Sequence, residues 1–143
     1  MKSINGIKYQ KLNFEKFKIE FLTLVTTLRN AKDFEEVQSS INSINAKRNL
    51  WESMLSIAEI NHFSDLTNPT YETALNHCEN YSVDLEGLVH TYYSGIVDSA
   101  YRTQIAEVYG KQLWEIPFNK IKIFDKNLKE LQVEETNLVM IEK

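Results

Sequence analysis

The longest regular pattern in the sequence is the stretch 33–62, DFEEVQSSINSINAKRNLWESMLSIAEINH. It opens with Asp33 and Glu36 at the spacing of a capping box, which marks the start of a helix. From there the inward positions recur at alternating steps of three and four, the period of one helical face. They are Phe34, Val37, Ile41, Ile44, Arg48, Trp51, Leu55, Ala58 and His62. The stretch therefore predicts one long helix. Its Ser- and Asn-rich middle has low helix propensity and must be held by packing.

Helical patterns also occur on both sides of this stretch. Asn13 is placed to cap a helix of about four turns that begins at Phe14, with Leu12 able to pack onto Phe17 as a hydrophobic staple. Asn68 followed by Pro69 predicts another helix start. Ser82 and Ser99 are further candidate caps. The apolar residues of these helices are Phe14, Phe17, Phe21, Leu24, Val25 and Leu28; Tyr71, Ala74, Leu75 and Cys78; Leu85, Leu88, Val89, Tyr92, Ile96 and Val97; and Tyr101, Ile105, Val108, Tyr109 and Leu113.

The C-terminal part is read in the same way. Pro117 is expected to end or kink the helix that follows Ser99, because proline clashes with the preceding turn. Residues 120–124 alternate polar and apolar side chains, as in a short strand, but their helical flanks favour a helix. A last helix is expected after Asp125, without a clear stop signal. The sequence predicts an all-α fold, a single domain 1–143 built as an antiparallel bundle or array of about five to six helices, with short loops that make sequential helices antiparallel neighbours.

Composition excludes several classes of partner. The net charge is −4, from 20 acidic and 16 basic residues with the two signs interspersed, so no cationic stripe is available for nucleic acid or an anionic membrane. Cys78 is the single cysteine, which excludes an internal disulfide and a thiolate zinc site, and it is expected to be buried. The first six residues are too polar for a signal peptide, and no apolar run approaches ~18 residues. We expect a cytoplasmic protein.

The three histidines give two candidate constellations. Glu59 and His62 are three apart and share a helical face, as in di-iron carboxylate bundles, but such a site needs a second Glu-x-x-His unit that the sequence lacks. An ion pair on the helix surface is the favoured interpretation of Glu59 and His62. Glu86 and His90 are four apart, yet the zinc-peptidase motif His-Glu-x-x-His is absent. His77 has no glutamate three residues before it.

No nucleophile or phosphate site is indicated either. There is no Gly-x-Ser-x-Gly elbow, the four glycines are isolated from one another, and nothing near Cys78 suggests an activated thiol. Arg48 interrupts the apolar stripe and has Glu52 four residues on, which favours a structural ion pair over substrate recognition. The tyrosines, including Tyr92 and Tyr93, are expected mostly in the core, with a peptide groove as the alternative. The sequence thus predicts no catalytic, cofactor-binding or metal-binding residue.

Several stretches together resemble the N-terminal region of the oligoendopeptidase F family, zinc metallopeptidases of the thimet oligopeptidase type. The resemblance spans nearly the whole chain. Its residues are Arg48-Asn49-Leu50-Trp51-Glu52-Ser53-Met54 with Ala58 and His62; Leu85-Glu86-Gly87-Leu88-Val89 with Tyr92-Tyr93; Tyr101-Arg102 leading to Gly110-Lys111-Gln112-Leu113-Trp114; and Glu130-Leu131-Gln132-Val133-Glu134-Glu135.

In that family a His-Glu-x-x-His helix and a further glutamate bind zinc several hundred residues beyond the region matched, so no catalytic residue carries over to this chain. The resemblance implies an all-helical segment that forms part of the wall of a deep cleft for short, unfolded peptides. We therefore expect a non-catalytic N-terminal domain or truncated product whose partner is the remainder of a peptidase. The alternative is a free-standing helical module that binds a protein or peptide through an exposed apolar face. A metal-binding bundle using Glu59 and His62 is the third hypothesis.

Overall fold

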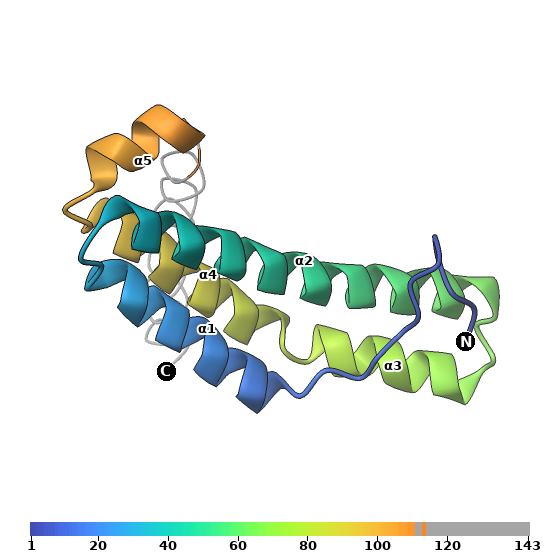
Figure 1. Cartoon of the computed structure of the whole chain (residues 1–143). Coiled ribbons are helices and arrows are strands. Elements are labelled where there is room, and N and C mark those ends of the chain that lie inside the picture. The colour runs from blue at the N-terminus through green and yellow to red at the C-terminus, as the bar shows by residue number, and fades with distance from the viewer. Residues whose placement is uncertain (111–112, 114–143) are drawn as a thin grey trace, which may run out of the picture.

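The computed structural model describes residues 1–110 and 113, and every regular element in this part is a helix apart from one isolated bridge near the N-terminus (Figure 1). The helices are α1 (Phe14–Arg29), α2 (Phe34–Ser64), α3 (Pro69–Glu79), α4 (Ser82–Val97) and α5 (Arg102–Tyr109). The predicted all-α class is confirmed. Five helices make the upper estimate of six slightly high for this part of the chain. The predicted helix after Asp125 and the ambiguous residues 120–124 lie outside the described residues.

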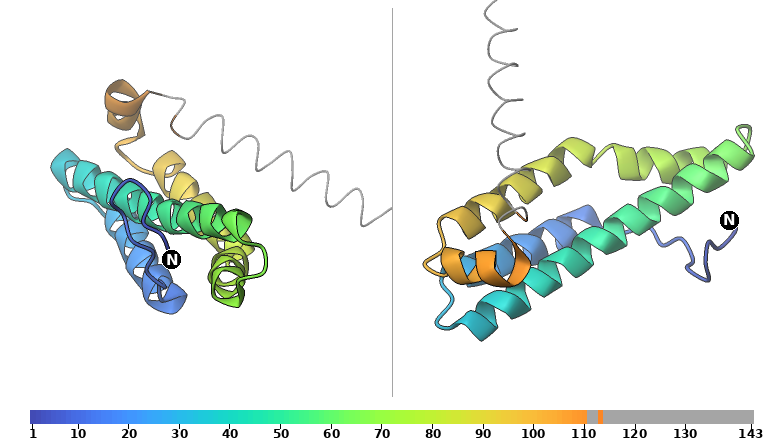
Figure 2. Two further views of the ribbon diagram at one scale, coloured as in Figure 1. Left: turned by 90° about the vertical axis from the view of Figure 1, so that its right-hand side faces the viewer. Right: turned by 90° about the horizontal axis from the view of Figure 1, so that it is seen from above.

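Helix α2 runs the length of the described part of the chain, and α1, α3 and α4 lie along it (Figure 1). Its first half packs against α1, its second half packs against α3, and α1 also packs against α4. Helix α5 touches α4 at the end where α2 begins (Figures 1 and 2). We call α1, α4, α5 and the first half of α2 the body, and residues 52–79, the second half of α2 with α3, the arm.

The expectation that all sequential helices are antiparallel neighbours is wrong for α3 and α4. These two helices follow one another along the same side of α2, in the same direction (Figures 1 and 2). The cause is the backbone of the two linking residues. Asn80 has φ −60° and ψ −23°, and Tyr81 has φ −103° and ψ 6°, so the chain stays near the helical region and does not reverse. The pairs α1/α2 and α2/α3 are antiparallel, as predicted.

Three of the predicted helix starts are confirmed by their caps. The side chain of Asn13 accepts a hydrogen bond from Lys16 N, that of Asp33 from Glu36 N, and that of Asn68 from Thr70 N and Tyr71 N. Each cap satisfies backbone donors that have no partner inside the helix. The Glu36 carboxylate accepts from Lys32 N at 3.2 Å, one residue before the position that a capping box uses. The long stripe of α2 therefore starts where its sequence indicates.

Ser82 and Ser99 do not cap their helices as predicted. Ser82 lies inside α4 and its Oγ donates to Glu79 O at 2.9 Å, while Tyr81 holds the cap position without a side-chain bond. Ser99 Oγ accepts from Tyr101 N at 3.0 Å, so it shapes the turn before α5. Helix α5 then ends well before Pro117. Gly110 at φ 83° adopts a conformation that side-chain-bearing residues avoid, and the helix stops there.

Most of the buried apolar residues fall into two separate clusters. The larger lies in the body, where Phe21, Ile41 and Tyr92 bring α1, α2 and α4 together. The smaller lies in the arm and consists of Ala58, Ala74, Leu75 and Cys78, with Tyr9 and Leu55 against it. Met54 and Ile57 are also buried in the arm, which makes six buried apolar residues there against fourteen in the larger cluster, so the arm buries less apolar surface than the body does. Along the described residues no helix is both long and apolar enough to cross a membrane.

Candidate functional site

Trp51 joins the arm to the body. Its ring is 2% exposed and lies 5.5 Å from the ring of Phe14 and 5.3 Å from that of Phe17, both on α1. It also lies 6.1 Å from Tyr81, in the link between α3 and α4, and 6.3 Å from His77 on α3. Aromatic pairs at such separations add to the stability that burial alone provides. Trp51 is therefore a structural residue, as its place in the predicted stripe indicated.

Arg48 lies one turn before Trp51 and does not form the predicted ion pair with Glu52. Its Nη1 donates to the hydroxyl of Tyr93 on α4 at 3.1 Å, and its guanidinium lies 5.7 Å from the centre of that ring. An arginine that faces a packed interface needs a partner that fits there, and the ring of Tyr93 offers an acceptor and a π face together. Tyr92 and Tyr93 are buried, which confirms the predicted core position of these two tyrosines.

Glu59 and His62 do not form a metal site in the structure. Neither an ion pair between the two nor a group of three metal-binding side chains occurs among residues 1–110 and 113. His62 instead packs its ring against Phe63, 5.3 Å away. Tetrahedral zinc in enzymes takes three protein ligands. The described residues do not fit the zinc of the resembled family, and the surface ion pair predicted for Glu59 and His62 is wrong as well.

Cys78 is buried in the arm cluster, as predicted. Burial raises the pKa of its thiol above the ordinary 9.0, and the nearby Glu59 and Glu79 carboxylates raise it further, while a hydrogen bond with Tyr9 acts in the opposite direction. The thiol is therefore neutral at pH 7 and unsuited to nucleophilic attack. Glu86 is exposed on α4, and it forms no three-ligand group with His90.

The N-terminal segment, residues 1–13, has a structural role that the sequence reasoning missed. It runs back along the arm, where Asn61 accepts from Lys2 N and donates to Lys2 O, both at 3.0 Å. Further along, Leu12 O lies 2.8 Å from His77 Nε2. Between these anchors Ile4 and Ile7 exchange two backbone hydrogen bonds across a tight turn at Asn5 and Gly6. The dipeptide Asn-Gly, with both φ positive here, was the available sequence signal.

A pocket of about 380 Å³ lies between this turn and the outward face of α2. Its size is within the ~300–1,000 Å³ typical of small-ligand sites. The turn and α2 contribute apolar side chains, and α2 adds a row of polar groups and one carboxylate. The lining residues are Ile4, Asn5, Ile7, Asn49, Glu52, Ser53, Ser56 and Ile57.

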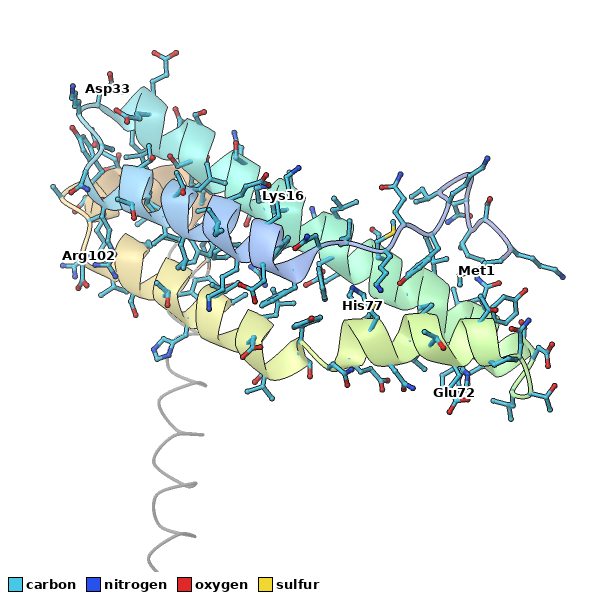
Figure 3. The ribbon with its side chains drawn as sticks, turned by 90° about the horizontal axis from the view of Figure 1, so that it is seen from below. Met1, Lys16, Asp33, Glu72, His77 and Arg102 are labelled. Carbon is cyan, nitrogen blue, oxygen red and sulfur yellow. The ribbon has the colours of Figure 1, made fainter. Side chains whose placement is uncertain are left out.

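The charges are less evenly interspersed than the composition suggested. From Asn49 to Tyr101 the sequence contains no lysine or arginine, yet it contains eight acidic residues: Glu52, Glu59, Asp65, Glu72, Glu79, Asp84, Glu86 and Asp98. Glu72 lies on the side of α3 away from the N-terminal segment, whereas His77 faces that segment (Figure 3).

The tip of the arm exposes large apolar side chains. Phe63 is 70% exposed, Leu66 64% and Ile60 49%, and Met1 lies at the same end (Figure 3). Other exposed apolar residues, such as Ile19 on α1 and Val83 on α4, are scattered singly, as on any protein surface. Exposed apolar residues that gather at one place typically mark a contact surface. The tip of the arm is therefore the place where exposed apolar side chains gather on the part of the chain that the structure describes.

Comparison with known proteins identifies the family. Residues 4–124 match the family described as the Peptidase M3 N-terminal domain. The chain is similar to the solved structure of a putative oligoendopeptidase F from Bacillus anthracis strain Ames, with 30% identity and a TM-score of 0.75 over 80% of this chain and 21% of that one. It is also similar to PZ peptidase A solved with inhibitor 2, at 28% identity and a TM-score of 0.74, over 78% of this chain and 20% of that one.

No curated protein matches the sequence. The chain spans about a fifth of the length of the two solved peptidases. The resemblance based on residues 48–54, 85–93, 101–102 and 110–114 is thereby confirmed, since all of these lie inside the matched region, whereas residues 130–135 lie beyond it. The chain belongs to the peptidase M3 family, and it carries that family's N-terminal domain.

Proposed function

We propose that this chain serves as the non-catalytic N-terminal helical domain of an oligoendopeptidase F-like zinc metallopeptidase and helps to form the wall of its peptide-binding cleft. The observation that carries the proposal is the family match over residues 4–124 on a chain that spans a fifth of its solved relatives. No step of peptide hydrolysis is assigned to this chain. A reducing compartment such as the cytoplasm belongs to the same proposal, because Cys78 is free.

The arm supports the proposal. Removing a domain from the chain that it packs against leaves apolar side chains uncovered. Phe63, Leu66 and Ile60 at the tip of the arm are such side chains. The buried cluster of the arm, by contrast, consists of Ala58, Ala74, Leu75 and Cys78, and Met54 and Ile57 are buried in the arm as well. We propose that the tip is covered by the remainder of the peptidase.

A peptidase assay tests the proposal. The purified chain is mixed with internally quenched peptides, with added zinc and with a chelator. We expect no hydrolysis above the buffer control under either condition, because the sequence contains no His-Glu-x-x-His motif. Zinc-dependent hydrolysis that the chelator abolishes would overturn the non-catalytic assignment.

The second candidate is a free-standing interaction module, and the same exposed tip favours it. The two candidates differ in what the tip does when no peptidase is present. Sedimentation at several protein concentrations, with a dye that binds apolar surface, separates them. A stable complex of the chain with itself, abolished by Phe63→Ser but not by Val83→Ser, supports the module. A monomer whose tip binds the dye supports the first candidate, a peptidase domain whose apolar tip is uncovered because the rest of the peptidase is absent.

A further inference from the structure

The N-terminal segment contacts both helices of the arm. Its residues 8–12 form neither a helix nor a strand, and they pass along the arm in a single stretch (Figures 1 and 3). Asn61 and Met54 contact the segment from α2, and His77 and Cys78 contact it from α3. The hydrogen-bonded partners are 44 to 65 positions apart in the sequence. The contact is therefore tertiary, of the kind that a separate peptide would make.

The arm holds the segment mainly by its main chain. Asn61 Oδ1 accepts from Lys2 N and Asn61 Nδ2 donates to Lys2 O, both at 3.0 Å. The same Nδ2 donates to Ile57 O at 2.9 Å, which fixes the orientation of the amide on α2. His77 Nε2 donates to Leu12 O at 2.8 Å, because a carbonyl oxygen only accepts. Every peptide offers main-chain N–H and C=O groups, so these bonds provide affinity without reading a sequence.

Tyr9 is the side chain that the arm recognises. Its ring packs against the buried cluster of the arm, and its hydroxyl shares a hydrogen bond with the Cys78 thiol. The neighbouring side chains of Lys8 and Gln10 are exposed. Main-chain bonds combined with a place for one side chain are the way in which domains select unfolded peptides. A tyrosine at this position therefore distinguishes a peptide that fits the arm from one that does not.

The segment is loosely held, whereas its partners on the arm are deeply seated. None of residues 1–12 is buried, and only Ile4, Tyr9 and Leu12 among them are half-buried. Asn61 and Cys78, by contrast, are 2% and 3% exposed. Terminal segments with few buried contacts open at a low cost in free energy, without unfolding of the domain. The face of the arm under the segment is thus uncovered each time that the segment opens.

We propose that this face of the arm is a peptide-binding site, that residues 1–12 are its built-in ligand, and that an unfolded peptide with a tyrosine at the corresponding position can replace them. Asn61 and His77 hold the main chain of the incoming peptide, and its tyrosine takes the place of Tyr9 beside Cys78. The inference goes beyond the proposed function and does not depend on it, because it rests on contacts within the arm and the N-terminal segment alone.

The test uses the whole chain with Tyr9→Ala and a peptide added in trans. The peptide is residues 1–12 with an acetyl and an amide cap, and the readout is the rate at which Cys78 reacts with an aromatic disulfide reagent. We expect Tyr9→Ala to raise that rate about tenfold over the wild-type chain, because the cover of the thiol opens more often. The peptide at about 1 mM, near the effective concentration of a tethered segment, should then slow the reaction at least about twofold.

Two further peptides are the matched controls. The peptide with Lys8→Ala should protect Cys78 as well as the native peptide does, because the Lys8 side chain is exposed. The peptide with Tyr9→Ala should protect it far less. The wild-type chain provides a second measurement that needs no substitution in the protein. In its ¹⁵N NMR spectrum, excess native peptide should displace the tethered segment and shift the amides of Ile4 and Ile7, whereas the peptide with Tyr9→Ala should leave them in place.

Three results would overturn the inference. The first is a Cys78 thiol that reacts no faster in the Tyr9→Ala chain, which would show that the segment does not cover it. The second is a native peptide that neither protects Cys78 nor shifts the amides of the segment at millimolar concentration. The third is equal protection by the peptides with and without Tyr9, which would show that the arm does not recognise this side chain.

Discussion

Replacing Trp51 with alanine should destabilise the domain more than any other single truncation on α2. Trp51 is 2% exposed and stacks or abuts four rings, those of Phe14, Phe17, His77 and Tyr81. Truncating a buried tryptophan costs about 3–5 kcal/mol, and ring pairs contribute about 0.5–1.5 kcal/mol each beyond area burial. We therefore expect Trp51→Ala to lower the free energy of unfolding by about 4 kcal/mol, in the upper half of that range. That is a large share of the ~5–15 kcal/mol by which domains are stable.

The assay is thermal denaturation followed by circular dichroism at the helical minimum, which reports every helix. Trp51→Ala should lower the unfolding midpoint temperature by about 12 °C, from about 3 °C per kcal/mol at this chain length. The matched control is Leu50→Ala, since Leu50 is the adjacent residue and is 44% exposed. It should change the free energy of unfolding by no more than about 1 kcal/mol. Equal effects of the two substitutions would refute the assignment of Trp51 as the joint between arm and body.

Three further outcomes are expected. Asn61→Leu should free the N-terminal segment, because Asn61 holds Lys2 at both its N–H and its carbonyl. Residues 1–13 should then become sensitive to limited proteolysis; retained protection would contradict this role. Gly95→Ala should be tolerated, because its Cβ would lie 3.4 Å from Val25 Cγ1, whereas Gly95→Leu should cost about 1–3 kcal/mol in a melting experiment by separating α1 and α4. Equal stability of the two variants would show that α1 and α4 do not pack closely there. The free energy of unfolding should fall above about pH 8.5–9, because the pKa values of Cys78 and Tyr9, the latter raised to about 12, exceed those in the unfolded chain. Cys78→Ala with Tyr9→Phe should flatten that fall, and an unchanged slope would refute the cause.

The local features of the fold were predictable from the sequence because their causes are local. Asn13, Asp33 and Asn68 cap helices through bonds to residues two or three positions on, and such bonds depend on sequence spacing alone. Ser82 has the same chemistry, but it lies inside α4, one residue past the cap position, and its hydroxyl donates to Glu79 O. The backbone at Asn80 and Tyr81 stays near helical values, which spacing does not reveal. The direction of α4 followed from that link.

The features that sequence reasoning missed depend on contacts between distant residues. Glu52 was assigned to Arg48 because four residues separate them, yet the partner is Tyr93, brought there by the packing of α4. With Arg48 engaged, Glu52 is left to line a pocket. The other side of that pocket is the turn at Asn5 and Gly6, some fifty residues earlier in the chain. The predicted single domain 1–143 and the helix after Asp125 stay predictions.

The central claim, that this domain shapes a cleft in a larger zinc peptidase and does not cut peptides itself, is tested most directly by reading the native coding region beyond Lys143. The account predicts an open frame that continues into a catalytic domain with a His-Glu-x-x-His helix. A stop codon directly after Lys143, in a transcript that encodes this chain alone, would contradict it and favour the free-standing module.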